Sequence, residues 1–429
     1  MKHLLLVLCW FPLSASCVAQ QASARFGALQ WTFHATGKIF SSPVLCGNLV
    51  LVGSEDDTLY ALDAATGIPR WTFRPGGPID GTPAVVGGTA FFNSYDGNLY
   101  AVDASSGRLT WKFRTRGEKR VGAMGLWTMK PATRYMEDPF DFFESSAVVD
   151  SSAGLLYFGS GDGNLYALGV SDGSLRWRFQ TGGIVHTTPA LSGHSVYFGS
   201  WDRNLYALDA RTGRQKWKFM TGADTTFHLL EGIQASPLVY GRDVFFGARD
   251  GNFYCLDTTT GRLVWKYDAA HSWILSTAAA SDHIIYTGTS DTYLLLALDS
   301  GTGKEKFRVA ASGYVYTPPV VNGQTVYFGD FTGLLLAADL RTGRIIDRFE
   351  TPLRKRHGAA LLHDGKLDFA FMTKGMNPAD YSTTLAGMKS LYTLGPVLCK
   401  PAIAKGVIYF CSADGTVYAV RLNVASNGR

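Results

Sequence analysis

The sequence predicts an all-β protein: an eight-bladed β-propeller of four-stranded antiparallel blades, closed by its N-terminal strand. Three observations predict this fold class. A unit of about 40 residues recurs along the chain, a period typical of propeller repeats. Each unit holds four short apolar runs separated by turn signals such as Asp-Gly, which predict antiparallel strands. The chain starts with the ending of a unit and finishes with a unit that has no ending, so the two termini are expected to complete one blade.

The repeat units can be placed in order along the chain. Seven units span residues 41–73, 81–113, 145–179, 187–219, 235–267, 276–309 and 317–349. The eighth spans residues 399–423 and lacks the G-x-x-x-W ending, whereas "RFGALQWTF" supplies one from Arg25. We therefore expect residues 28–33 to pair with residues 416–421 and close the ring, which removes exposed sheet edges.

Recurrent residues inside the units have structural explanations. The Gly that follows Thr in "TG" suits a positive φ, and the Asp of "ALD" is expected to cap the same turn. Phe307 and Asp347 replace the tryptophan in the sixth and seventh units. No long stretch has a 3.6-residue period, so few helices are expected. The recurrent tryptophans are expected to pack between blades, and they are Trp31, Trp71, Trp111, Trp177, Trp217 and Trp265.

The segments "ALDAATGIPRW", "AVDASSGRLTW", "ALDARTGRQKW" and "CLDTTTGRLVW" resemble the A-x-D-x-x-T-G-x-x-x-W motif of the PQQ-type (pyrroloquinoline quinone, quinoprotein-like) propeller superfamily. The resemblance covers nearly the whole chain and implies the fold more specifically than the function. The superfamily includes quinoprotein alcohol dehydrogenases, which use the cofactor. It also includes BamB, a propeller lipoprotein of the outer-membrane barrel-assembly machinery, which does not. The unit at Ala167 departs from the motif, with Gly169 in place of Asp.

The N-terminus has the pattern of a signal peptide over residues 1–24. Lys2 precedes "LLLVLCWFPL", and cleavage is expected after Ala19 or Ala24. Residues 25–429 then form a single propeller with insertions at 114–143 and 350–398. We expect a periplasmic or secreted protein without a transmembrane segment, and the resemblance to BamB implies a possible outer-membrane association. A lipid anchor is the minority alternative, because Ser14 stands where a lipoprotein signal has Leu before Cys17.

Composition and missing motifs exclude several functions. A formal net charge of +5 over 429 residues is no nucleic-acid signature. The chain has no C-x-x-C-H haem motif, no nucleophile elbow and no P-loop. Quinoprotein alcohol dehydrogenases are longer and usually carry adjacent cysteines, which this chain lacks. No catalytic residue, metal or cofactor is assigned, and PQQ with calcium is kept as an alternative.

Insertions between blades emerge on one face of a propeller, which we call the decorated face. Rigid scaffolds with inserted loops commonly carry function there. Two insertions are basic, "RTRGEKR" and "LRKRH", and predict loops that bind a partner or an anion. The alternative is ordinary solvated charge, and the acidic stretch "MEDPFDFFE" could neutralise the first run. The residues concerned are Arg114, Arg116, Lys119, Arg120, Arg354, Lys355, Arg356 and His357.

The innermost strands place polar residues around the central channel. Three residues before the recurrent Pro position stand Asp80, Glu144, His186, Gln234 and Tyr316. With neighbouring positions they form a candidate ligand site at the channel mouth: Asp80, Glu144, His186, His228, Glu231, Gln234, Tyr316 and Lys400. The set Glu144, His186, His228 and Glu231 would suit a divalent metal chemically. A water-filled channel lined by hydrogen-bonded polar residues is the favoured alternative.

The cysteines Cys399 and Cys411 bracket the hairpin "CKPAIAKGVIYFC". A turn centred on Lys405 would place them opposite each other and permit a disulfide. A two-residue turn that pairs Ala404 with Val407 would offset them by one residue and forbid it. Cys255 is expected to be a buried free thiol.

Three functions from different classes remain open. The first is a non-enzymatic exported scaffold, similar to BamB, that binds proteins through the decorated face. The second is a PQQ-dependent oxidoreductase, and the third is a small-molecule or metal-binding module at the channel mouth. The absent cysteine pair and haem motif favour the first.

Overall fold

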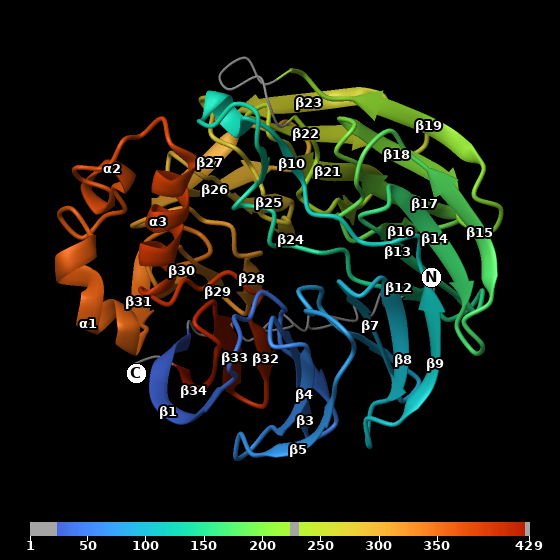
Figure 1. Ribbon diagram of the computed structural model, residues 1–429, viewed down its shortest axis with the longest axis horizontal. Helices are drawn as coiled ribbons and strands as arrows, with labels where there is room; N and C mark the ends of the chain where they lie inside the picture. Colours follow the sequence, from blue (N-terminus) through green and yellow to red (C-terminus); the bar gives the residue numbers. More distant parts are fainter. Residues whose placement is uncertain (1–23, 224–230, 425–429) are drawn as a thin grey trace, which may run out of the picture.

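The computed structural model describes residues 24–223 and 231–424. Within these residues, eight four-stranded antiparallel sheets surround a central axis as the blades of a propeller (Figure 1). This arrangement confirms the predicted fold class. The predicted signal peptide falls almost entirely outside the described residues.

The blades follow one another in chain order, each running from an inner to an outer strand. The first contains β2 (Val44–Cys46), β3 (Leu49–Ser54), β4 (Thr58–Asp63) and β5 (Pro69–Phe73). The second contains β6 (Ala84–Val86), β7 (Thr89–Ser94), β8 (Asn98–Asp103) and β9 (Leu109–Arg114). The third contains β12 (Val148–Asp150), β13 (Leu155–Gly159), β14 (Asn164–Gly169) and β15 (Leu175–Gln180). The fourth contains β16 (Ala190–Ser192), β17 (Ser195–Gly199), β18 (Asn204–Asp209) and β19 (Gln215–Met220).

The second half of the ring repeats this plan. The fifth blade contains β20 (Leu238–Tyr240), β21 (Asp243–Gly247), β22 (Asn252–Asp257) and β23 (Leu263–Asp268). The sixth contains β24 (Ala279–Ser281), β25 (Ile284–Gly288), β26 (Leu294–Asp299) and β27 (Glu305–Ala310). The seventh contains β28 (Val320–Asn322), β29 (Thr325–Gly329), β30 (Leu334–Asp339) and β31 (Ile345–Glu350). The eighth contains β32 (Ala402–Ala404), β33 (Val407–Ser412), β34 (Thr416–Val424) and the N-terminal β1 (Ala24–His34).

Strand β1 closes the ring by completing the last blade. Phe33 pairs with Val417 and Trp31 with Ala419, as predicted, and the pairing continues beyond the predicted segment to Ala24 and Val424. Ala24 is buried, and its carbonyl accepts the Tyr327 hydroxyl at 3.0 Å. Cleavage of a signal peptide after Ala24 would remove this residue from the strand, whereas cleavage after Ala19 would keep the whole strand.

The repeated tryptophans pack against the next blade. A Cβ on Gly67 would lie 2.6 Å from the Trp31 ring, and the indole N–H of Trp31 donates to the Ala64 carbonyl at 3.0 Å. In the sixth blade Phe307 takes the same position against Gly343. Glycine is favoured at these positions for two reasons: the backbone has a positive φ, and a Cβ would collide with the aromatic ring. The other pairs are Trp71 with Gly107, Trp111 with Gly173, Trp177 with Gly213, Trp217 with Gly261 and Trp265 with Gly303.

The aspartates of the repeat cap the Thr-Gly turns, as predicted. Asp63 Oδ1 accepts the N–H groups of Ala65 and Thr66, while Arg70 contacts Oδ2 at 2.8 Å. The Arg70 hydrogen bond is the largest cause that lowers the Asp63 pKa to about 2. Where Gly169 replaces this Asp, Asp172 accepts the Ser174 N–H instead.

Segment 350–398 contains three helices, which the sequence did not predict. They are α1 (Pro352–Leu361), α2 (Phe369–Met372) and α3 (Tyr381–Tyr392). Helix α1 buries no side chain, whereas α3 buries Tyr381, Met388 and Leu391 together with Thr383, Thr384 and Gly387. Helix α1 therefore has no apolar stripe, and the apolar positions of α3 are interleaved with threonines and a glycine. None of the described helices is long and apolar enough to cross a bilayer.

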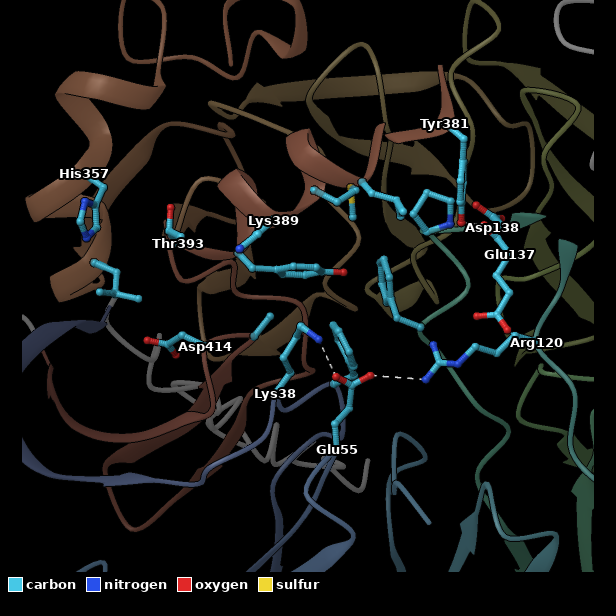
Figure 2. A pocket seen from close by; sticks show the side chains of 18 residues that line it. Lys38, Glu55, Arg120, Glu137, Asp138, His357, Tyr381, Lys389, Thr393 and Asp414 are labelled. Atoms are coloured by element: carbon cyan, nitrogen blue, oxygen red, sulfur yellow. Dashed lines mark hydrogen bonds and ion pairs between the residues drawn. The ribbon is translucent and has the colours of Figure 1, made fainter. Parts of the chain in front are cut away.

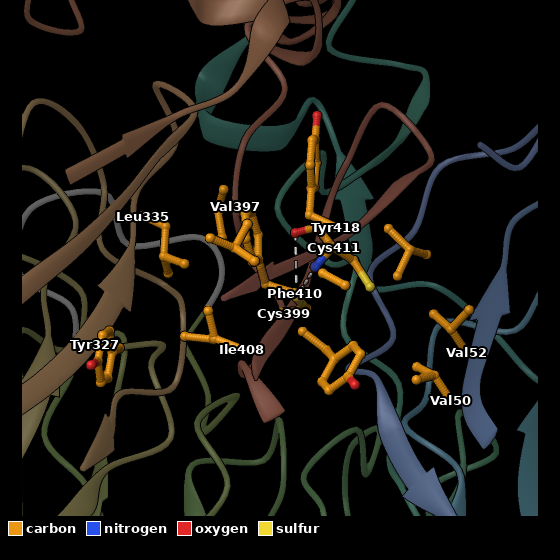
Figure 3. Packing of buried hydrophobic residues seen from close by; sticks show 14 of the residues in the cluster. Val50, Val52, Tyr327, Leu335, Val397, Cys399, Ile408, Phe410, Cys411 and Tyr418 are labelled. Atoms are coloured by element: carbon orange, nitrogen blue, oxygen red, sulfur yellow. Dashed lines mark hydrogen bonds between the residues drawn. The ribbon is translucent and has the colours of Figure 1, made fainter. Parts of the chain in front are cut away.

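Cys399 and Cys411 are both free thiols, so the disulfide that the turn centred on Lys405 would have permitted is absent. Ala404 pairs with Val407 across a two-residue turn whose residues both have positive φ, which is the register that offsets the cysteines. The Cys399 thiol instead accepts the Cys411 N–H at 2.8 Å in a buried cluster (Figure 3). Cys255 is a buried free thiol, as predicted, and burial raises its pKa.

Candidate functional site

Two insertions meet above the channel on the decorated face. The first carries β10 (Gly122–Met124), the 3-10 turn η1 (Leu126–Thr128) and β11 (Tyr135–Glu137), and the second carries α3 (Figure 1). Lys130 N–H donates to the Ala379 carbonyl at 2.8 Å, and the Tyr381 hydroxyl donates to the Glu137 carbonyl at 2.6 Å. These contacts join insertions that leave the ring at the second and seventh blades.

Aromatic side chains of the first insertion fill the channel mouth. Phe142 stacks on Phe40 with ring centroids 5.0 Å apart, and both are buried in one cluster with Phe140, Tyr316 and Phe331. Tyr316 occupies a ring position predicted from the repeat, and Phe40, three residues before Pro43, occupies the equivalent position in the first blade. The sequence did not predict that Phe140 and Phe142 would descend onto them.

Beneath this plug, the predicted polar residues do come together. Asp80, Glu144, His186, Gln234 and Tyr316 line one cavity of about 80 Å³. The remaining candidates lie elsewhere or outside the description. Lys400 does not line the cavity, Glu231 pairs with Arg203 at 2.7 Å, and His228 lies outside the described residues.

The hydroxyl residues next to the recurrent Pro form a hydrogen-bonded arc around the channel. The backbone N–H of each residue donates to the hydroxyl of the next blade, at distances from 2.8 to 3.1 Å. The arc does not continue through Pro318, which has neither an N–H nor a hydroxyl. It runs from Lys400 through Ser42, Thr82, Ser146 and Thr188 to Ser236. These hydroxyls therefore join neighbouring blades.

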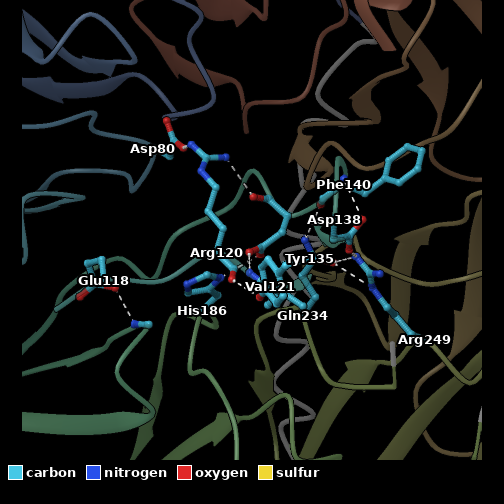
Figure 4. A network of polar contacts seen from close by, with 12 residues as sticks. Asp80, Glu118, Arg120, Val121, Tyr135, Asp138, Phe140, His186, Gln234 and Arg249 are labelled. Carbon is cyan, nitrogen blue, oxygen red and sulfur yellow. Dashed lines mark hydrogen bonds and ion pairs between the residues drawn. The ribbon is translucent and has the colours of Figure 1, made fainter. Parts of the chain in front are cut away.

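The first insertion supplies partners for the buried ring residues (Figure 4). Asp141 contacts His186 Nδ1 at 2.8 Å, and Arg120 Nη2 lies 3.4 Å from both Asp80 and Glu55. Gln234 Nε2 donates to the Phe140 carbonyl at 2.8 Å. The chain itself therefore covers the channel site and contacts Asp80, His186 and Gln234, whereas neither carboxylate oxygen of Glu144 has a hydrogen-bond partner among the described residues.

Arg249 forms the deepest part of this network. Its guanidinium lies between the rings of Trp201 and Trp273, 4.5 and 4.4 Å from their centroids. Asp138 Oδ2 lies 2.6 Å from its Nη2, and both side chains are fully buried. The acidic stretch of the insertion thus neutralises Arg249 and faces His186, and its contact with the neighbouring basic run is at Arg120, whose Nη1 donates to the Asp141 carbonyl at 3.4 Å.

Burial shifts the protonation of the carboxyl groups in the channel. Burial and then the Glu55 charge raise the pKa of Asp80 to about 8, against the opposing Arg120 charge. Burial, followed by the Glu118 charge, raises the pKa of Glu144 well above its ordinary value, while the Gly81 peptide opposes the shift. Burial therefore disfavours the charged form of Glu144 in the folded protein.

We expect the replacement Glu144→Gln to change how stability depends on pH. The folded protein keeps a proton that the unfolded chain releases above about pH 4.5, so the unfolding free energy falls as pH rises. The variant should therefore melt at a higher temperature than the wild type at about pH 8 and at the same temperature near pH 4. The exposed Glu137→Gln is the matched control, and an equal difference at both pH values would contradict the prediction.

The two basic runs do not form one patch. They belong to the second and seventh blades, on different sides of the ring (Figure 1). Arg120 faces the channel, and Arg354 Nη1 donates to the Thr332 carbonyl at 2.9 Å. His357 lines a pocket described below. The exposed members are Arg114, Arg116, Lys119, Lys355 and Arg356.

An open pocket of about 670 Å³ lies where the two insertions meet blades one and eight (Figure 2). We call it the rim pocket. Its apolar wall is built from Phe40, Phe142, Leu385, Met388 and Tyr392, and its charged wall from Lys38, Glu55, Arg120, Lys389 and Asp414. Such a mixture of apolar area with a few charges is typical of binding sites.

The charges of the rim pocket are partly paired. Glu55 bridges Lys38, at 2.7 Å, and Arg120, at 3.4 Å. Lys389 lies on α3 with its side chain exposed and forms no ion pair with the described residues. Leu385, one turn earlier, is 44% exposed. Both residues are therefore available to a molecule outside the chain.

The turn between the second and third strands carries a signal that sequence reasoning missed. The residue before the Asp position of this turn varies from blade to blade, and at several blades it reaches the mouth. Glu55 and Tyr95 contact Arg120, and Phe331 joins the aromatic plug. Trp201 and Arg249 occupy the same position in the fourth and fifth blades. A large or charged residue at this turn position, in place of a small one, therefore indicates a side chain that reaches the channel mouth.

A family model described as outer membrane protein assembly factor BamB matches residues 17–126, 123–272 and 249–360. The chain belongs to the BamB family. Among solved structures, BamB from Moraxella catarrhalis is 17% identical with a TM-score of 0.66, covering 92% of this chain and 99% of that chain. A search of curated proteins found no match.

Two further solved structures share the propeller fold of the BamB family. The quinohemoprotein alcohol dehydrogenase from Comamonas testosteroni is 14% identical with a TM-score of 0.66, covering 94% of this chain and 77% of that chain. The computationally designed Ika8 protein is 15% identical with a TM-score of 0.63, and the match covers 94% of this chain and 100% of that chain. At these identities the likeness shows the fold alone.

The channel mouth does not fit a PQQ cofactor. The cavity of about 80 Å³ is well below the roughly 300 Å³ at which small-molecule sites begin, and Phe40, Phe140 and Phe142 fill the space above it. Among the described residues, no cluster of three or more His, Cys, Asp or Glu side chains is arranged to hold a metal.

Proposed function

We propose that this protein is an exported, non-enzymatic scaffold that binds a protein partner through the rim pocket. The observation that carries the proposal is the junction of the two insertions. It fills the channel mouth with the chain's own aromatic side chains and leaves an open pocket of about 670 Å³ at its edge. A large open pocket beside a filled channel favours a binding surface over a buried reaction site.

The composition of the surface around the pocket suits a protein partner. Protein interfaces centre on apolar anchors surrounded by polar groups. Leu385 is exposed at the pocket, and Met124 and Tyr135 are 58% and 54% exposed on the adjoining hairpin of the first insertion. The description of the family as an outer membrane protein assembly factor adds support for a protein partner and for an outer-membrane association.

Export to the periplasm is part of the proposal. The N-terminal pattern of Lys2 and an apolar run supports a signal peptide, and the buried Ala24 in β1 supports cleavage after Ala19. The mass of the mature protein from the periplasmic fraction checks both statements, and retention of the chain in the cytoplasm would contradict them.

The oxidoreductase alternative and the channel-mouth ligand alternative have less support. Each needs an accessible channel mouth, and the aromatic plug occupies that space. We therefore assign no catalytic residue.

The affinity for a protein partner should depend on the exposed Leu385 and Lys389 of α3. A photo-crosslinking residue at Leu385 should capture a partner, and the same residue at Lys405, on the opposite face, should not. Once the partner is identified, Leu385→Asp with Lys389→Glu should weaken its affinity about tenfold or more, as loss of an interface anchor does. Lys405→Glu is the matched control.

The exposed basic residues are tested in the same assay. Charge reversal at Arg116 and Arg356 reports whether the interface extends to both sides of the ring. Unchanged affinity for the Leu385 and Lys389 variant, with an unchanged melting temperature, would refute the role of the rim pocket.

A further inference from the structure

A second cavity on the decorated face has an aromatic wall. It measures about 270 Å³ and lies between the first insertion and the sixth blade. Its described lining is Trp127, Met129, Phe140, Trp273, Asp291, Tyr314 and Tyr316. Five of these seven residues are aromatic, so aromatic rings form most of the wall. We call this site the aromatic cage.

The rings of the cage are held in fixed relative positions. The Trp127 centroid lies 5.9 Å from Phe140 and 6.1 Å from Trp273. Tyr314 lies edge-on to Phe140 at 5.9 Å and stacks on Tyr316 at 5.6 Å. The rings come from the insertion, from the connection before blade six and from the connection before blade seven. Three separate segments therefore converge on one cavity.

The charge of the cage is negative. Asp291 is its charged residue among the described lining, which contains no Lys, Arg or His. Asp291 lies exposed at the opening and accepts the Ser290 hydroxyl at 2.6 Å. Aromatic faces carry a negative quadrupole, so the rings and the carboxylate attract the same kind of ligand, a cation.

The guanidinium of Arg249 does not reverse this preference. It lies 4.4 Å from the Trp273 ring and outside the cage lining, and Asp138 at 2.6 Å balances its charge. The Trp201–Arg249–Trp273 stack instead fixes one wall of the cage. Attraction for a cation then comes mainly from Trp127, Tyr314 and Asp291.

We propose that the aromatic cage binds a small quaternary ammonium ion, such as the trimethylammonium group of choline. A primary ammonium has three N–H groups that must exchange water for protein acceptors, and the described wall offers only the Asp291 carboxylate and two tyrosine hydroxyls for them. A quaternary ammonium has no N–H group to satisfy, so it gains the cation–π attraction without that cost. This ligand class is separate from the protein partner of the rim pocket.

The test compares choline with 3,3-dimethylbutan-1-ol, which has the same shape and no charge. Calorimetric titration of the mature protein should show saturable binding of choline and of tetramethylammonium, and binding of the neutral alcohol at least about tenfold weaker. Equal binding of the two would show a merely hydrophobic cavity and would overturn the proposal, as would absence of saturable binding by both cations.

Substitutions in the cage test whether choline binds at this site. Asp291→Asn should weaken choline binding about threefold or more, and Trp127→Leu should weaken it about tenfold or more. The exposed Asp282→Asn, on the opposite-face turn of the same blade, is the matched control and should leave the affinity unchanged. Equal losses for Asp291→Asn and Asp282→Asn would place the binding elsewhere. Because Asp291 is exposed, an unchanged melting temperature is expected for its variant, and this separates lost binding from lost folding.

Discussion

Deleting residues 26–33 is expected to lower the melting temperature of the protein by more than about 10 °C, or to prevent it from folding as a soluble monomer. These residues form most of β1, which is the outer strand of the eighth blade. Their loss would expose the edge of β34 and remove the buried Trp31 from its contacts with Gly67 and Tyr409. An unpaired, apolar edge also favours association between molecules.

The matched control keeps the strand and moves the chain ends. A circular permutant that starts at Gly37 and carries residues 24–36 after residue 424, through a short linker, retains every blade. It should melt close to the wild type, because chain ends tolerate relocation when the elements they connect are preserved. Thermal unfolding followed by circular dichroism compares the three proteins. A deletion variant as stable as the wild type would show that ring closure by β1 contributes little.

The closure could be predicted because the information for it is local. Each blade repeats the same turn chemistry, so the missing ending of the last unit and the extra ending at Trp31 are recognisable without any long-range contact. The same is true of the Asp63 cap and the Gly67 turn, whose partners lie within a few residues. Sequence patterns with a fixed period predict such features well.

The channel mouth could be predicted only in part. The inner-strand positions of Asp80, Glu144, His186 and Gln234 follow from the repeat, and the structure brings them to one cavity. Their partners come from an insertion that has no repeat, so the path of Asp138 and Asp141 across the channel is not encoded in any period. The helices of segment 350–398 were missed for a related reason, because they lie in an insertion without a repeat and α3 interleaves its buried Tyr381, Met388 and Leu391 with threonines and a glycine.

A single residue of register decides between the disulfide and the free thiols of Cys399 and Cys411. Both turns were open from the sequence, and Lys405–Gly406 is a favourable pair for the two-residue turn because Gly accepts a positive φ. The structure has Lys405 at φ 48° and Gly406 at φ 73°. One residue of offset was enough to place the two thiols out of bonding position.

Replacing Asp138 with alanine is expected to cost about 3–5 kcal/mol of unfolding free energy, the usual result of removing one partner of a buried ion pair. Arg249 would stay between two indoles with no counter-charge, although Gln234 Oε1 would still accept its Nη2–H at 2.6 Å. Asp138 also accepts the Phe140 N–H at 3.0 Å. Asp138→Asn therefore keeps an acceptor for Phe140 while removing the charge, and it should separate the two contributions. Urea unfolding gives the free energies.

A second substitution distinguishes an uncompensated charge from a lost contact. Arg249→Met, made together with Asp138→Asn, places an apolar chain between Trp201 and Trp273. The double variant should recover most of the lost unfolding free energy, because apolar replacements of buried ion pairs are often neutral or stabilising.

Hydrogen exchange should show residues 114–143 opening before the blades in Asp138→Ala alone, since the ion pair joins this insertion to blade five. Asp138 and Phe142 also line the rim pocket, so partner affinity should fall in the single variant while the ring stays folded. A cost below about 1 kcal/mol, or exchange that is uniform over the chain, would show that the insertion is held by its aromatic contacts rather than by this pair.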